Sequence, residues 1–123
     1  MTIIEAISRF DAQHNNAYTQ EEKIAWLSRV DWEIWQEIVK THEHDEAQTF
    51  SGYNADTPLD TRLLAEPPYD TLYLRYMEAQ MHYLNDEFAR YNNAITVYNT
   101  DIAAFEAWYN RTHKPVSTTL KFF

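Results

Sequence analysis

Residues 87–112 read EFARYNNAITVYNTDIAAFEAWYNRT, and the spacing of the large apolar side chains in this stretch decides the fold class. These side chains recur at intervals of 3, 4, 3, 4, 3 and 4 residues, at Phe88, Tyr91, Ile95, Tyr98, Ile102, Phe105 and Tyr109. A helix brings positions with this spacing onto one face, and three unbroken heptads keep that face turned toward a partner helix. We therefore predict a long helix whose helix-pair seam packs against the preceding helix or against another chain.

A second helical pattern precedes this one. Prolines at 67 and 68 stand where a helix begins, because the missing amide of a proline costs nothing there. The apolar positions then alternate by three and four, at Tyr69, Leu72, Tyr76, Ala79 and Tyr83. Asn85 and Asp86 mark a break, so we expect the last two helices to lie antiparallel; the alternative is one continuous helix.

The first forty residues predict two more helices. Thr2 with Glu5, and Thr19 with Glu22, each have the spacing of a capping box, in which two side chains satisfy each other's free backbone amides. Apolar residues at helical spacing follow both boxes and predict helices over about 2–13 and 19–41. In the second of these helices Asp31 interrupts the apolar stripe.

Residues 42–68 lose the helical pattern and predict a long irregular connection. A short strand pair near residues 50–54 and a helical turn near 60–64 are the alternatives for this stretch, since connections of this length often carry some structure. We expect the connection to bury little apolar surface by itself. The fold class is thus all-α, with a single helical domain at 1–115 and a C-terminal tail at 116–123.

The composition favours helices and indicates the compartment in which the protein is found. The 123 residues include one glycine and four prolines, which are too few turn-forming residues for a β-sandwich. There is no cysteine, so the chain cannot form disulfide bonds. The N-terminus lacks the basic and apolar regions of a secretory signal, and no stretch is apolar enough to span a bilayer. These features favour an intracellular protein that does not enter the membrane.

The charge is strongly acidic and unevenly distributed. The net charge is −9, and residues 1–68 hold 13 acidic against 5 basic side chains, while residues 69–123 hold 6 against 5. Affinity for nucleic acids requires lysines and arginines that neutralise phosphates, and here they are scattered singly. We expect no tight nucleic-acid binding.

Candidate partner-binding residues come from the surplus of aromatic side chains. Trp32 lies farthest from the apolar stripe of its helix, so it is the tryptophan most exposed in the isolated chain, and exposed tryptophan often anchors a partner. The alternative is a large residue at a crowded edge of the core. The full set of candidates is Trp32, Trp35, Phe50, Tyr53, Leu120, Phe122 and Phe123.

Catalytic and metal-binding patterns are not found in the sequence. The run His42–Glu46 has side chains of the types that bind metals. Zinc sites, however, usually take their ligands from more than one structural element, and this run is a single element. A solvated acidic loop is therefore the favoured interpretation. No nucleophile with a base and no glycine-rich phosphate loop can be assembled. We expect no enzyme, no metal and no cofactor.

Several segments resemble small proteins encoded beside the major capsid gene in tailed phages and prophages of Gram-positive bacteria. The resemblance covers most of the chain and is carried by Glu22–Leu27, Pro67–Leu74, Ala79–Met81, Ala89–Asn93 and Trp108–Pro115. Proteins of this kind are similar to head-tail connectors, which are helical head-completion or adaptor subunits.

The resemblance implies a virion protein that assembles into a ring, contacts the portal and tail-side proteins, and is found in the virion and, during assembly, in the bacterial cytoplasm. It also implies that the ring encloses the path of the DNA, and we hypothesise that part of the negative charge faces this path and repels the DNA. The alternative from another class is a small helical adaptor or regulator that binds one host or phage protein as a monomer or dimer.

Overall fold

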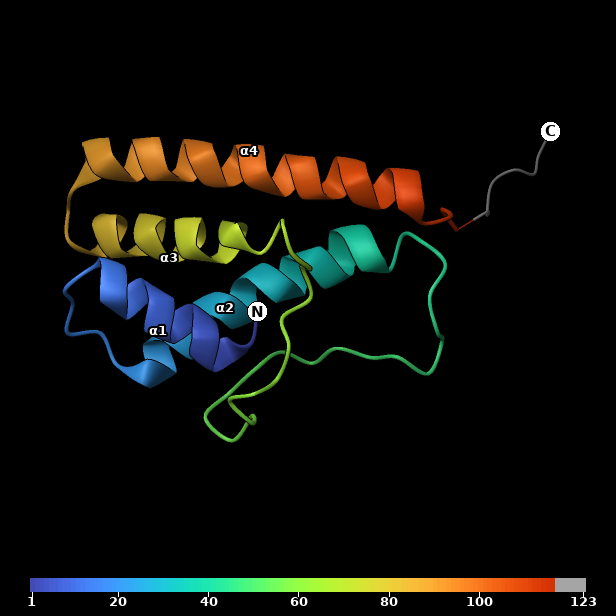
Figure 1. Cartoon of the computed structure of the whole chain (residues 1–123), viewed down its shortest axis with the longest axis horizontal. Helices are drawn as coiled ribbons and strands as arrows, with labels where there is room; N and C mark the ends of the chain where they lie inside the picture. Colours follow the sequence, from blue (N-terminus) through green and yellow to red (C-terminus); the bar gives the residue numbers. More distant parts are fainter. Residues whose placement is uncertain (117–123) are drawn as a thin grey trace.

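The predicted helix pair is present at the C-terminal end of the chain. The computed structural model describes residues 1–116, and in it α3 (Thr71–Leu84) and α4 (Phe88–Thr112) lie side by side and antiparallel (Figure 1). They are joined by a turn in which Asp86 has a φ of 60° and the Glu87 amide donates to the His82 carbonyl at 2.8 Å. This left-handed residue reverses the chain within three residues, so the alternative of one continuous helix is wrong.

Both predicted capping boxes start helices. In α1 (Ile3–Gln13) the Thr2 hydroxyl accepts from the Glu5 amide at 3.2 Å, and the Glu5 carboxylate accepts from the Thr2 amide at 2.8 Å. In α2 (Gln20–Ile34) the same two bonds join Thr19 and Glu22 at 3.1 and 3.0 Å. Each box satisfies amides that a helix start leaves free, which is why the sequence predicts both starts correctly.

The end of the second predicted helix has a different geometry. Instead of continuing as an α-helix to about residue 41, the chain passes into a π-helix, η1 (Trp35–Val39), and the Lys40 amide donates to the Trp35 carbonyl at 3.0 Å. A π-turn holds one more residue than an α-turn and so shifts the buried face. As a result Trp35, Ile38 and Val39 are all buried.

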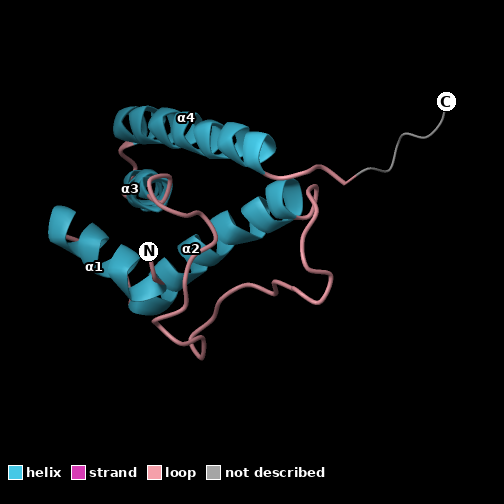
Figure 2. Ribbon diagram, turned by 45° about the vertical axis from the view of Figure 1, so that its right-hand side comes forward, coloured by secondary structure: helices cyan, strands magenta, loops and turns pink. Residues whose placement is uncertain are grey.

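The elements form layers around α3. Seen nearly end-on, α3 lies between α4 on one side and the layer of α1 and α2 on the other (Figure 2). Leu72, Tyr73 and Met77 of α3 are completely buried at the centre. The all-α prediction is confirmed, and residues 1–116 contain only two isolated β-bridges and no strand.

Helix α4 covers only one side of this core. Its buried residues are Ala94, Tyr98 and Phe105, and the other members of the predicted seam are half-buried except Phe88, which is 54% exposed. Phe88 lies at the start of α4 beside the turn, and its ring packs against Tyr83 near the end of α3, with ring centres 6.0 Å apart. The opposite face of α4 is open to solvent.

The connection at 42–68 packs against the helices more closely than the sequence predicts. Leu63 and Ala65 are buried, and the backbone near Leu63 pairs with the first residues of the chain, with bonds such as Ile3 amide to Thr61 carbonyl at 3.0 Å. The expectation that this segment buries little apolar surface is therefore wrong. Its irregular backbone satisfies its polar groups against the helices and the N-terminus instead of within a strand pair.

Of the helices in residues 1–116, not one combines the length and the apolar character that a membrane span requires.

Candidate functional site

A buried carboxylate on α2 organises the site. Asp31 is completely buried; one of its oxygens accepts from the Tyr73 hydroxyl at 2.5 Å, and the other accepts from the Tyr53 hydroxyl at 2.5 Å and the Leu64 amide at 3.0 Å. The Tyr73 hydroxyl in turn accepts from the Ala65 amide at 2.7 Å. A buried carboxylate requires such donors, because burial without them is very costly. Asp31 thereby ties α2 to α3 and to two points of the connection.

This environment changes the acidity of Asp31. Burial raises the pKa of its carboxyl group from 3.8 to about 6, and the hydrogen bonds from Tyr53, Tyr73 and Leu64 oppose that rise. Because the pKa in the folded chain lies above the ordinary value, the folded state holds the proton more tightly than the unfolded state does. The stability contributed by Asp31 is therefore complete below about pH 4 and is lost as the pH rises through 6.

We expect a specific pH dependence from this residue. A pKa raised from 3.8 to about 6 corresponds to roughly 3 kcal/mol in the free energy of unfolding. Denaturant titrations of the wild type and of Asp31→Asn should therefore differ by about 2.5 kcal/mol more at pH ~4 than at pH ~7, in favour of the wild type at the lower pH. Because the two chains share all other titratable groups, the contributions of those groups cancel in the difference. A difference that stays constant with pH would contradict the expectation.

The Asp31 centre places an aromatic patch on the outer side of α2. The Tyr53 amide donates to the Ser28 hydroxyl at 2.9 Å, and the Phe50 ring packs against the rings of Trp32, Trp35 and Tyr53 at 6.1, 6.4 and 5.1 Å. Trp32 remains 45% exposed. We call Trp32 and Phe50 the Trp32 patch.

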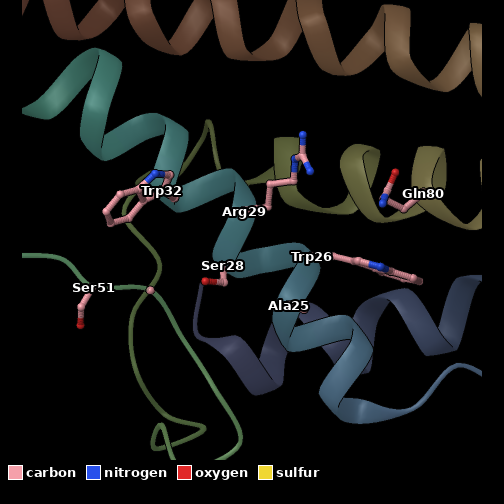
Figure 3. Close-up of a pocket in the computed structure, with 8 residues that line it drawn as sticks. Ala25, Trp26, Ser28, Arg29, Trp32, Ser51 and Gln80 are labelled. Atoms are coloured by element: carbon pink, nitrogen blue, oxygen red, sulfur yellow. The ribbon is translucent and has the colours of Figure 1, made fainter.

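An open hollow of about 580 Å³ adjoins this patch (Figure 3). Trp26 and Trp32 lie on either side of it, and the rest of the wall consists of Ala25, Ser28, Arg29, Ser51, Gly52 and Gln80. Gly52 has a φ of +92°, and a Cβ atom there would lie 2.9 Å from the Ser28 hydroxyl, so the close approach of the connection to α2 requires glycine. Indole faces beside a guanidinium and an amide suit the binding of a protein side chain.

The predicted partner-binding residues divide into three groups. Trp32 is exposed and Phe50 and Tyr53 are half-buried beside it, so the structure brings these three together. Trp35 is 6% exposed and belongs to the core, so it offers little surface to a partner. Leu120, Phe122 and Phe123 lie outside the residues that the structure describes.

The His42–Glu46 run has a structural explanation. The His42 ring is buried, with one nitrogen 2.6 Å from the Ile38 carbonyl and the other 2.8 Å from the Asn110 amide oxygen, and it joins the end of η1 to the end of α4. Over residues 1–116, no group of three or more His, Cys, Asp or Glu side chains is arranged to hold a metal ion.

A second exposed apolar patch lies at the α3–α4 turn, where the sequence analysis did not predict a binding surface. Tyr83, Leu84 and Phe88 are each about half exposed, and the rings of Tyr83 and Phe88 lie 6.0 Å apart. We call these three residues the turn patch. These residues lie where the helix pair ends, so α3 and α4 cover them only in part, and a search for periodic apolar residues does not reveal this. Comparison of the chain with protein-family models, with curated proteins and with solved structures gave no match.

Proposed function

We propose that this chain is a structural subunit of a phage head-tail connector, which assembles into a ring and joins portal to tail-side proteins without enzymatic activity. Two lines of reasoning support the proposal. The first is the resemblance of five segments of the sequence to connector proteins. The second is the presence of two separate apolar patches on the surface of the chain.

The two patches are the observation that carries the proposal. A ring forms when one surface of each subunit binds a different surface of the next, so each subunit needs two interfaces. The Trp32 patch lies on α2 and the connection, whereas the turn patch lies at the junction of α3 and α4. We propose that the turn patch of one subunit packs against the Trp32 patch of its neighbour.

The charge of the chain is compatible with this function. A net charge of −9 and scattered basic residues favour a surface that DNA passes without binding. In this proposal the protein belongs to the virion, and to the bacterial cytoplasm while virions assemble.

The alternative function is a small adaptor or regulator that binds one protein as a monomer or dimer. The hollow beside Trp32 favours this alternative, since one exposed tryptophan at the edge of a cavity is sufficient to anchor a single partner. In that case the turn patch makes no contribution to assembly.

Mixed-variant sedimentation separates the two functions. Trp32→Ala removes one interface, and Leu84→Ala with Phe88→Ala removes the other, while Val97→Ala trims an exposed apolar residue outside both patches. We expect the wild type and the Val97 variant to associate weakly at rising concentration, and each interface variant to remain monomeric. An equimolar mixture of the two interface variants should form one-to-one pairs that grow no further, because each pair has one intact interface.

A different pattern would contradict the ring. A dimer that depends on Trp32 alone and is unaffected by the turn-patch variant would favour the adaptor. Growth of the mixture beyond pairs would show that other surfaces drive the assembly.

A further inference from the structure

A groove separates α2 and η1 from α4; at one end it meets the turn patch at Tyr83, and it shares Arg29 and Gln80 with the hollow beside Trp32. It consists of two adjoining hollows of about 530 and about 230 Å³, which share Glu33, Tyr98 and Asn99 in their walls. Helix α3 contributes Tyr76, Gln80 and Tyr83 to the larger hollow. We call the two hollows together the tyrosine groove.

The tyrosines of this groove have free hydroxyl groups. Tyr76, Tyr83, Tyr91 and Tyr98 line it, and their rings pack edge to face in two pairs, Tyr76 with Tyr98 at 5.2 Å and Tyr83 with Tyr91 at 5.3 Å. Within residues 1–116 none of the four hydroxyls has a hydrogen-bond partner. Paired rings with open hydroxyls form a rigid surface that keeps its hydrogen-bonding capacity for a partner.

Tyr98 is the most informative of the four. Its side chain is only 5% exposed, yet it borders both hollows. Every fully buried side-chain nitrogen or oxygen of residues 1–116 has a hydrogen-bond partner, so the unpaired Tyr98 hydroxyl reaches the open space of the groove. A buried aromatic ring whose hydroxyl opens into a groove, and bonds no other group of the described residues, leaves that hydroxyl free to bond an external donor or acceptor.

The rim of the groove is acidic. Glu33, Glu37 and Glu106 border the smaller hollow, and the only basic side chain among the lining residues is Arg29, which lies 3.8 Å from Glu33. Burial and the nearby carboxylates of Glu33 and Glu37 raise the pKa of Tyr98, so its hydroxyl stays protonated. The uncompensated negative charge attracts a cation and repels a nucleic acid.

The wall formed by α4 also has apolar contacts at helical spacing. Ile95 and Ile102 are half-buried, border the larger and the smaller hollow respectively, and lie seven residues apart on one face of α4. Seven residues span roughly 10 Å of helix, or two turns. Apolar contacts two turns apart, flanked by charge, match the face of an amphipathic helix laid into a groove.

We propose that the tyrosine groove binds a cationic amphipathic helix of a partner protein. In the complex a lysine or arginine of that helix pairs with Glu33 and Glu37 and donates a hydrogen bond to the Tyr98 hydroxyl, and apolar residues of the helix pack on Ile95 and Ile102. The proposal does not depend on the connector function. Tyr83 borders both the groove and the turn patch, but the residues that carry the binding, Glu33, Glu37, Ile95, Tyr98 and Ile102, belong to neither the turn patch nor the Trp32 patch.

Titration of the full-length chain with two synthetic peptides tests the proposal. One is a helical peptide with leucine and lysine at alternating spacings of three and four, and the other has glutamate in place of every lysine. We expect the lysine peptide to shift the backbone amide NMR signals of Glu33, Tyr98 and Asn99, with a smaller effect at higher salt. The glutamate peptide should leave these signals unchanged.

Variants locate the binding site. The double variant Glu33→Gln with Glu37→Gln should lower the affinity for the lysine peptide at least tenfold. Tyr98→Phe, which keeps the ring, should lower this affinity several-fold. The matched control is Glu21→Gln with Glu46→Gln, which removes the same charge from exposed positions elsewhere. It should leave the affinity within about twofold.

Three results would overturn the proposal. One is equal weakening by the groove variant and the matched control, because attraction would then come from overall charge. Another is an absence of shifts in the groove, or shifts confined to the hollow beside Trp32. The third is a change of the same groove signals on simple dilution of the chain, which would show that a second copy occupies the groove.

Discussion

Replacement of Asp31 by alanine should lower the free energy of unfolding by about 3 to 5 kcal/mol. The variant leaves the buried Tyr73 hydroxyl and the Leu64 amide without their acceptor, and each unsatisfied buried donor costs on the order of 1–3 kcal/mol. A cavity at the centre of α2 adds to the loss. Against a total stability of about 5–15 kcal/mol, this change brings a domain of this size close to unfolding.

Asp60→Ala is the matched control for Asp31→Ala. It removes the same atoms from an exposed position in the connection, and it should change stability by less than about 0.5 kcal/mol. Denaturant titration gives both values, and hydrogen exchange at the Leu64 amide reports whether the connection has detached. Equal stability of the Asp31 variant and the wild type would show that the buried carboxylate is not the link between α2 and the connection.

Phe105→Ala should have an effect of similar size, about 3 to 5 kcal/mol, for a different reason. Phe105 is 1% exposed and packs against Tyr69, Trp108 and Tyr109, with ring centres 5.8 to 5.9 Å apart. Truncation of a buried phenylalanine loses its transfer free energy and leaves a cavity that the surrounding rings fill only in part. Thermal and chemical denaturation should both show the Phe105 variant to be less stable than the wild type.

The same truncation at Phe88 provides the control. Phe88 belongs to the same apolar seam but is 54% exposed, so Phe88→Ala should cost less than about 0.5 kcal/mol. A loss at Phe88 as large as that at Phe105 would mean that the start of α4 is covered in solution, as it would be in a stable assembly.

The helices were predictable because their signals are local. The heptad of residues 88–109, the two capping boxes and the break at Asn85 each lie within a few turns of chain, and each corresponds to an observed helix, helix start or turn. The π-turn at Trp35 was not predictable, since its width accommodates the packing of Trp35, Ile38 and Val39 in the core. Apolar periodicity alone predicts that the α-helix continues through this stretch.

The candidate sites were predictable only in part. The angular position of Trp32 on its helix correctly indicated exposure, but the same argument did not exclude Trp35, whose burial depends on Phe50 and His44 packing against its ring. The turn patch comes from α3 and α4, and the tyrosine groove from α2, η1, α3 and α4, which meet only in the folded chain. Residues such as Glu33 and Tyr98 lie far apart in the sequence, and no spacing rule connects them.

By itself the sequence determined the fold class, the four α-helices, their start signals and the antiparallel pair, because capping, turn formation and apolar periodicity act between residues close together along the chain. Tertiary structure decided how the connection packs and which aromatic residues remain exposed. Asp31 illustrates the physical reason: as a charge inside an apolar stripe it is unfavourable in isolation, and its donors lie 22 residues away at Tyr53, 33 at Leu64 and 42 at Tyr73. Only the folded chain brings those donors to the carboxylate, and with them it fixes the surfaces available to partners.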